Sequence, residues 1–153
     1  MSLLMTTVEG FGGHAIALGV AGIGSAIGTS TAAMGAIGMW NKYVLEKKKL
    51  PAMALALVGM PLSQVIYGMI FMNALISANL SPESYGHQMI LSLCVGLVIG
   101  ASAVLQGKTG AKACMNLAND PKAGIGMYIA VMGIVETVAL LAMVFGMGAI
   151  PQG

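Results

Sequence analysis

The segment IGMYIAVMGIVETVALLAMVFGMGAI, residues 125–150, contains a single charged side chain, Glu136. It is longer than the roughly 20 apolar residues that a helix needs to cross the hydrocarbon core of a bilayer. Three further stretches without a charged residue precede it, at residues 10–41, 50–82 and 84–107. Each of them also exceeds the bilayer length, so we expect the chain to cross a membrane four times.

The composition of the whole chain agrees with a membrane location. Hydrophobic residues make up 58% of the 153 residues and charged residues 8%, and the mean hydropathy is +0.89. Soluble proteins carry about 25% charged residues, so the composition excludes a soluble enzyme. The sequence contains no arginine, the residue best suited to grip phosphate, and this argues against a nucleic-acid partner.

We predict an all-α membrane protein made of two fused helical hairpins. The first hairpin is residues 1–80, with transmembrane helices at about 11–41 and 52–79, and the second is residues 81–153, with helices at about 86–117 and 123–150. Turn-forming residues mark the connections at 41–51 (NKYVLEKKKLP), 79–86 (NLSPESYG) and 119–124 (NDPKAG).

The lysines set the expected orientation. All seven lie in the first or third connection or at the end of the helix that leads into the third. The positive-inside rule places these two connections in the cytoplasm and both termini on the non-cytoplasmic side. We therefore expect a multi-pass protein of the plasma membrane.

The first and third helices share a short repeat. GSAI at residues 24–27 matches ASAV at residues 101–104, and the same register sets Thr29 opposite Gln106. Matched polar positions in otherwise apolar helices indicate a duplicated hairpin.

The second and fourth helices repeat as well. VGMPLSQVIYGMIF at residues 58–71 aligns without gaps to AVMGIVETVALLAM at residues 130–143, and this register sets Gln64 opposite Glu136. The duplication therefore has one carboxylate for two hairpins.

Small residues are concentrated in the first and third helices. Gly24 and Gly28, and likewise Gly96 and Gly100, have the G-x-x-x-G spacing that lets helix backbones approach closely in lipid. Small residues on all sides of a helix predict close neighbours on several sides, as in the inner ring of an oligomer. Packing within one four-helix bundle is the alternative.

Several polar residues lie at the depth of Glu136. A charge at the bilayer centre costs about 2.5–3.5 kcal/mol, so this carboxylate needs a partner or a function. Ser63, Gln64 and Tyr67 fall within about one turn of the second helix, and Gln106 lies in the third. Such oxygen ligands suit an alkali or alkaline-earth cation, and a single carboxylate favours a monovalent ion because the loaded site is then neutral.

These features resemble the rotor-ring proteolipid of V-type and A-type ATPases, called subunit K in bacteria, over nearly the whole chain. MPLSQVIYG, LQGK and IVETVAL are similar to the sodium-binding signature of its bacterial members. The resemblance implies five ion ligands and a tyrosine that hydrogen-bonds the carboxylate: the backbone carbonyl of Met60, the side chains of Ser63, Gln64, Gln106 and Glu136, and Tyr67. Ser63 replaces a frequent threonine and keeps its hydroxyl.

The backbone ligand stays open at this point. Pro61 lacks an N–H group and so leaves the carbonyl of Leu57 without its usual helical partner. The resemblance names the carbonyl of Met60 instead.

The resemblance also implies a function. Many copies would form a homo-oligomeric ring in lipid, turning against a stator membrane subunit that supplies two half-channels and an arginine. A central-stalk subunit would contact the cytoplasmic loops and transmit ATP hydrolysis from other subunits. The chain itself would then be non-catalytic, with no covalently bound cofactor, and would carry one Na⁺ at Glu136.

Two alternatives to this function remain. H⁺ could take the place of Na⁺ in the same rotor, since a carboxyl group in an apolar pocket suffices to carry a proton. The alternative of another class is a small four-helix multidrug or cation exporter. The position of the glutamate in the fourth helix and the 5% aromatic content argue against the exporter.

Overall fold

The computed structural model describes residues 2–120 and 123–151, with side chains from residue 13 onward. In these ranges the regular structure is entirely helical. The elements, in chain order, are α1 (Ser2–Leu45), α2 (Ala54–Gly59), the 3₁₀ turn η1 (Met60–Leu62), α3 (Ser63–Ser77), the 3₁₀ turn η2 (Pro82–Ser84), α4 (Tyr85–Asn119) and α5 (Ile125–Gly148).

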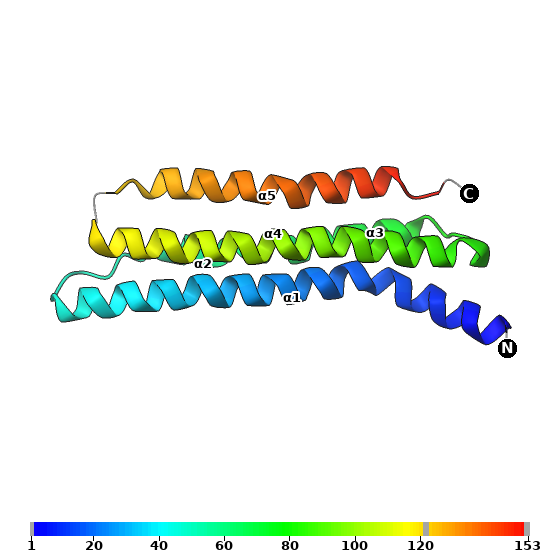
Figure 1. The fold of residues 1–153 in the computed structure, drawn as a ribbon, viewed down its shortest axis with the longest axis horizontal. Coiled ribbons are helices and arrows are strands. Elements are labelled where there is room, and N and C mark those ends of the chain that lie inside the picture. The colour runs from blue at the N-terminus through cyan, green and yellow to red at the C-terminus, as the bar shows by residue number, and fades with distance from the viewer. Residues whose placement is uncertain (1, 121–122, 152–153) are drawn as a thin grey trace.

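Four segments are long and apolar enough to cross a membrane, which confirms the predicted fold class. They are Gly13–Leu45, Ala54–Ser77, Pro82–Asn119 and Ile125–Gly148. The helices lie side by side along one axis, with α4 between α1 and α5 and with α2 and α3 behind α4 (Figure 1). The beginning of α1 and the end of α5 lie at the same end of the bundle, as an even number of spans requires.

The helix boundaries differ from the expected ones mainly in α1, which begins at Ser2 and not at about residue 11. Hydropathy locates the part of a helix that lies in lipid, whereas the backbone hydrogen bonds of the helix can continue beyond it. Left-handed residues follow α1 and α3, with φ of 54° at Lys47 and 45° at Asn79. Of the third predicted turn, Pro121 and Lys122 lie outside the described residues.

The contact between α1 and α4 depends on glycine. A side chain at Gly24 would overlap the backbone of Gly100, and one at Gly28 would overlap the carbonyl of Ala103. A side chain at Gly107 would in turn overlap the backbone of Gly28. The predicted G-x-x-x-G packing is therefore present within the chain, as backbone-to-backbone contact.

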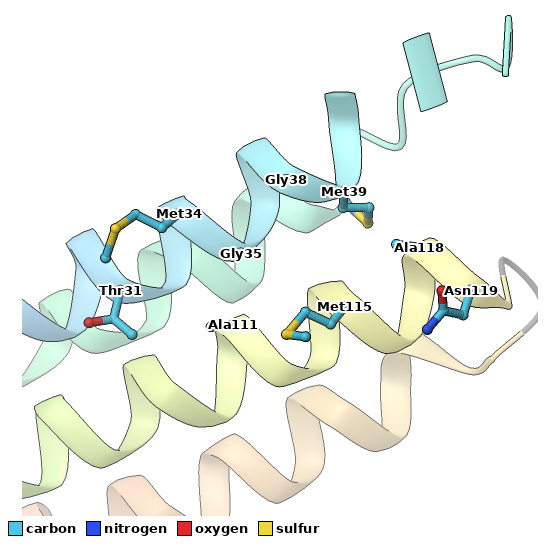
Figure 2. A pocket seen from close by; sticks show the side chains of 9 residues that line it. All are labelled: Thr31, Met34, Gly35, Gly38, Met39, Ala111, Met115, Ala118 and Asn119. Atoms are coloured by element: carbon cyan, nitrogen blue, oxygen red, sulfur yellow. The ribbon is translucent and has the colours of Figure 1, made fainter. Parts of the chain in front are cut away.

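The α1–α4 contact opens towards the Asn119 end into a groove of about 530 Å³ (Figure 2). The groove is lined by Thr31, Met34, Gly35, Gly38, Met39, Ala111, Met115, Ala118 and Asn119. At its end the ammonium group of Lys42 donates to Asn119 Oδ1 at 3.0 Å. This hydrogen bond ties the end of α1 to the end of α4.

Two apolar clusters fill the interior, and the polar residues lie between them. One cluster includes Phe71, Leu75 and Ile99, and the other includes Met39 and Leu57, all of them buried. Because apolar side chains lie on both sides of it, the polar layer between the clusters lies in the middle of the helical bundle, where Gln64 and Gln106 are buried.

Candidate functional site

The site lies where α3, α4 and α5 meet, around the half-buried carboxylate of Glu136 at the middle of α5. The hydroxyl of Tyr67 donates to Glu136 Oε1 at 2.7 Å. The side-chain amide of Gln106 donates to Glu136 Oε2 at 3.2 Å. Both carboxylate oxygens are therefore held by donors from the neighbouring helices, which fixes the position of the group.

Gln106 connects the carboxylate to the rest of the site. Its amide nitrogen also donates to the carbonyl of Met132 at 3.0 Å, and its amide oxygen accepts from Gln64 Nε2 at 2.9 Å. Gln64 and Gln106 are both fully buried. A buried amide is costly unless its groups are hydrogen-bonded, so these partners explain how two glutamines are accommodated inside the bundle.

Ser63 extends the network to the backbone. Its hydroxyl lies 2.9 Å from the carbonyl of Met60, to which it donates, and 3.2 Å from Gln64 Oε1. The backbone N–H of Ser63 also donates to the carbonyl of Met60. The 3₁₀ turn around Pro61 thus directs the Met60 carbonyl towards the polar layer.

The carbonyl of Leu57 has different surroundings. It lies against the backbone of α4, where a side chain added at Gly110 would come within 2.9 Å of it. The backbone oxygen that joins the polar network is therefore the one that the resemblance names, and not the one that the proline argument frees.

All six residues proposed from the sequence belong to one hydrogen-bonded network. It runs from the Met60 carbonyl through Ser63, Gln64 and Gln106 to Glu136, with Tyr67 at the end. Among the described residues, no three His, Cys, Asp or Glu residues lie together as a metal-binding group. The network offers neutral oxygens and one carboxylate, the chemistry that hard monovalent cations prefer.

One residue of this region was not predicted. The hydroxyl of Ser102 donates to the carbonyl of Val135 at 2.9 Å and so fixes α4 against α5 next to Glu136. The sequence signal was its position: Ser102 precedes Gln106 by four residues and therefore lies on the same face of α4.

The first hairpin contains no second copy of the network. Ser25 and Thr29 are the repeat equivalents of Ser102 and Gln106, and their hydroxyl oxygens are buried without a hydrogen-bond partner in the described structure. Gln64, the equivalent of Glu136, is bonded to Gln106 of the second hairpin. Both hairpins therefore contribute to one site.

One comparison with known proteins matches part of the chain to a family. Residues 89–148, which include most of α4 and all of α5, match the family of the C subunit of ATP synthase. That family comprises the non-catalytic membrane rotor proteins of ATP synthases and related ATPases. The matched segment contains Gln106 and Glu136, while the α3 residues of the site lie outside it. A comparison with curated proteins gives no match.

Proposed function

We propose that this chain is the ion-carrying rotor-ring subunit of a V-type rotary ATPase, equivalent to the bacterial subunit K. The match of residues 89–148 to the rotor-protein family supports the general role. The observation that carries the proposal is Glu136, in the middle of the apolar helix α5 and bonded on both oxygens within a network of neutral polar groups. An ionisable residue inside a membrane is costly and marks an ion pathway. A membrane protein with a purely structural role would not need such a network.

In this function Glu136 alternates between an ion-loaded and an ion-free state. A loaded carboxylate is neutral and can turn through lipid, whereas an ionised one facing hydrocarbon is strongly unfavourable. Glu136 lies on α5 and is only half-buried, so a stator protein can approach it from the lipid side. A stator arginine would compete for the carboxylate there and release the ion into a half-channel.

The proposed cargo is one Na⁺ per chain. Na⁺ must replace most of its water shell, and the network supplies oxygens for this purpose. They belong to the Met60 carbonyl and to the side chains of Ser63, Gln64, Gln106 and Glu136. In the ion-bound state these oxygens would turn to the ion, and Tyr67 would hold Glu136 in place. Because two hairpins share one site, the ring carries fewer ions per turn. More of the free energy of ATP hydrolysis is then available for each ion. Moving one charge across the membrane costs about 2.3 kcal/mol per 100 mV.

H⁺ remains the second candidate, and one observation favours it. Tyr67 and Gln106 already satisfy both oxygens of Glu136, so the network closes without a metal ion. A proton on Glu136 Oε1 would be donated to the oxygen of Tyr67, since the amide nitrogen of Gln106 can only donate.

Modification of Glu136 by a carbodiimide separates the two ions, because the reagent attacks the protonated acid. For a sodium rotor, Na⁺ added at constant pH and ionic strength should slow the modification, while choline should not. Gln106→Leu should weaken the protection by Na⁺ and leave the modification itself intact. Glu136→Gln should abolish the modification. If Na⁺ does not change the rate of modification across the neutral pH range, the Na⁺ assignment is wrong and the rotor carries protons. Absence of any carbodiimide-reactive carboxyl group in the membrane would contradict the rotor function itself.

A further inference from the structure

Two buried hydroxyl groups of α1 take no part in the network around Glu136. Ser25 is 1% exposed, and the oxygens Ser25 Oγ and Thr29 Oγ1 are buried without a hydrogen-bond partner in the described structure. A serine or threonine in a helix can bond to the carbonyl one turn earlier in the same helix. Thr31 does so, with a bond of 2.7 Å to the carbonyl of Ile27. The two buried hydroxyls do not, so they remain available to a group on another helix.

Two glycine contacts fix the register between α1 and the segment η1–α3. A side chain added at Gly68 of α3 would come within 2.8 Å of Ala21 Cβ, and one added at Gly28 of α1 would come within 3.0 Å of Pro61 Cβ. The two segments run in opposite directions (Figure 1). The contacts at both ends agree on one register, because seven residues separate the contact points on each segment.

This register places the two hydroxyls at the level of the site. Ser25 follows Ala21 by one turn on the face of α1 that packs against α3, and it lies at the level of Gln64. Thr29 lies one turn further on, at the level of Met60. Both hydroxyls therefore belong to the same layer of the bundle as the proposed ion ligands.

The repeat leads to the same neighbour. Thr29 is the equivalent of Gln106, and Gln106 donates to Glu136 Oε2 at 3.2 Å. The equivalent of Glu136 in the first hairpin is Gln64. The repeat therefore directs the side chain of Thr29 towards that of Gln64.

The amide of Gln64 needs acceptors in the proposed sodium-loaded state. Its nitrogen carries two hydrogens, and in the structure it donates to Gln106 Oε1 at 2.9 Å. When the amide oxygens of Gln64 and Gln106 both turn to Na⁺, the Gln64 nitrogen points away from the ion. Its two hydrogens then need acceptors within the bundle, because an unbonded donor is costly there.

We propose that the hydroxyls of Ser25 and Thr29 accept these two hydrogens and so hold the Gln64 oxygen towards Na⁺. Side chains four residues apart on a helix start about 5–6 Å from each other, a spacing that suits the two hydrogens of one amide group. The inference rests on the proposed function and assigns Ser25 and Thr29 as positioning residues for one of its ligands. Helix α1 thereby contributes to the site without touching the ion.

Thermal unfolding in detergent separates this role from a purely structural one. Ser25→Ala and Thr29→Val each remove a buried hydroxyl that has no partner in the described structure. The midpoint of unfolding measured without Na⁺ should therefore be unchanged. Na⁺ should raise the midpoint less in each variant than in the unaltered chain, because a ligand that binds less tightly stabilises less.

Protection of Glu136 from carbodiimide gives the size of the effect. The Na⁺ concentration for half-maximal protection should rise about fivefold in each variant, the usual effect of one lost hydrogen bond. Thr29→Ser keeps the hydroxyl and should bind Na⁺ like the unaltered chain.

Ser92→Ala is the matched control. Ser92 is buried, and its hydroxyl oxygen accepts the N–H of Ala17 at 3.0 Å. It precedes Gln106 by about 21 Å along α4 at 1.5 Å per residue. The control variant should lower the midpoint of unfolding with and without Na⁺ and leave the protection by Na⁺ unchanged.

A double-mutant cycle shows whether the hydroxyls act through Gln64. In a Gln64→Leu background, Ser25→Ala should cause no further loss of Na⁺ protection, since no amide is left to hold. A full additional loss would overturn the inference. Unchanged protection in Ser25→Ala or in Thr29→Val would remove that hydroxyl from the site and leave the sodium function standing. If Na⁺ does not protect the unaltered chain either, the sodium function is wrong and the inference is wrong with it.

Discussion

Gln64 of α3 donates a hydrogen bond to Gln106 of α4 over 2.9 Å, and both side chains are fully buried. In the repeat Gln64 holds the position of Glu136, yet it serves the site of the other hairpin. The first hairpin therefore has an amide at the position of the carboxylate, and this amide belongs to the network around Glu136. An amide at position 64 can supply an oxygen to a cation without adding a second charge to the site.

Replacing Gln64 by leucine should weaken Na⁺ binding strongly. The variant loses one oxygen ligand and leaves Gln106 Oε1 without its donor, and an unsatisfied buried group costs about 1–3 kcal/mol, or roughly 5- to 150-fold in affinity. The measurement is the Na⁺ concentration that gives half-maximal protection of Glu136 from carbodiimide. Gln88→Leu is the matched control, since Gln88 is as deeply buried but its amide has no partner in the described structure. Equal Na⁺ protection in the two variants would exclude Gln64 from the site.

Replacing Tyr67 by phenylalanine should have a smaller effect on the same quantity. The variant removes the 2.7 Å hydrogen bond to Glu136 Oε1 and keeps the ring in place. A typical intramolecular hydrogen bond contributes about 1 kcal/mol, which corresponds to roughly fivefold weaker Na⁺ protection. Tyr43→Phe is the control, because it loses a 3.1 Å bond to the Leu117 carbonyl far from Glu136. If both variants bind Na⁺ equally, Tyr67 does not position the carboxylate.

The four spans and the membership of the polar layer were predictable from sequence for a simple reason. Charged side chains are so unfavourable in lipid that the uncharged stretches of the sequence delimit the helices. The polar residues within those stretches are few, and each needs another as its hydrogen-bond partner. The network that joins Gln64, Gln106 and Glu136 confirms that they lie together.

Two features depend on geometry that hydropathy does not encode. Pro61 allows more than one carbonyl to turn out of the helix, and in the structure the Met60 carbonyl, at the 3₁₀ turn, accepts hydrogen bonds from Ser63. The bond from Ser102 to the Val135 carbonyl depends on the rotation of α4 against α5. Both are decided by packing, which becomes visible only when the helices are placed side by side.

The orientation in the membrane is testable by labelling in intact cells. The positive-inside rule places the Lys47–Lys49 connection in the cytoplasm. A cysteine at Lys48 should therefore resist a membrane-impermeant maleimide, while a cysteine at Glu83, in the opposite connection, should react. Both variants should carry Cys94→Ser so that the exposed native thiol does not contribute. Reaction at Lys48 with protection at Glu83 would reverse the topology.

The α1–α4 contact should tolerate no side chain at Gly24. A Cβ atom there would overlap the backbone of Gly100, and because that obstacle is backbone, the two helices must separate to admit it. Overpacking of this kind costs about 1–3 kcal/mol for added methylene groups in ordinary cores. We expect Gly24→Ala to lower the midpoint of thermal unfolding in detergent by several degrees and Gly24→Leu to prevent stable assembly. Gly38→Ala is the matched control on the same helix, since nothing lies within 4 Å of its added Cβ. Equal thermal stability of Gly24→Ala and Gly38→Ala would show that the helices are not held by backbone contact at this position.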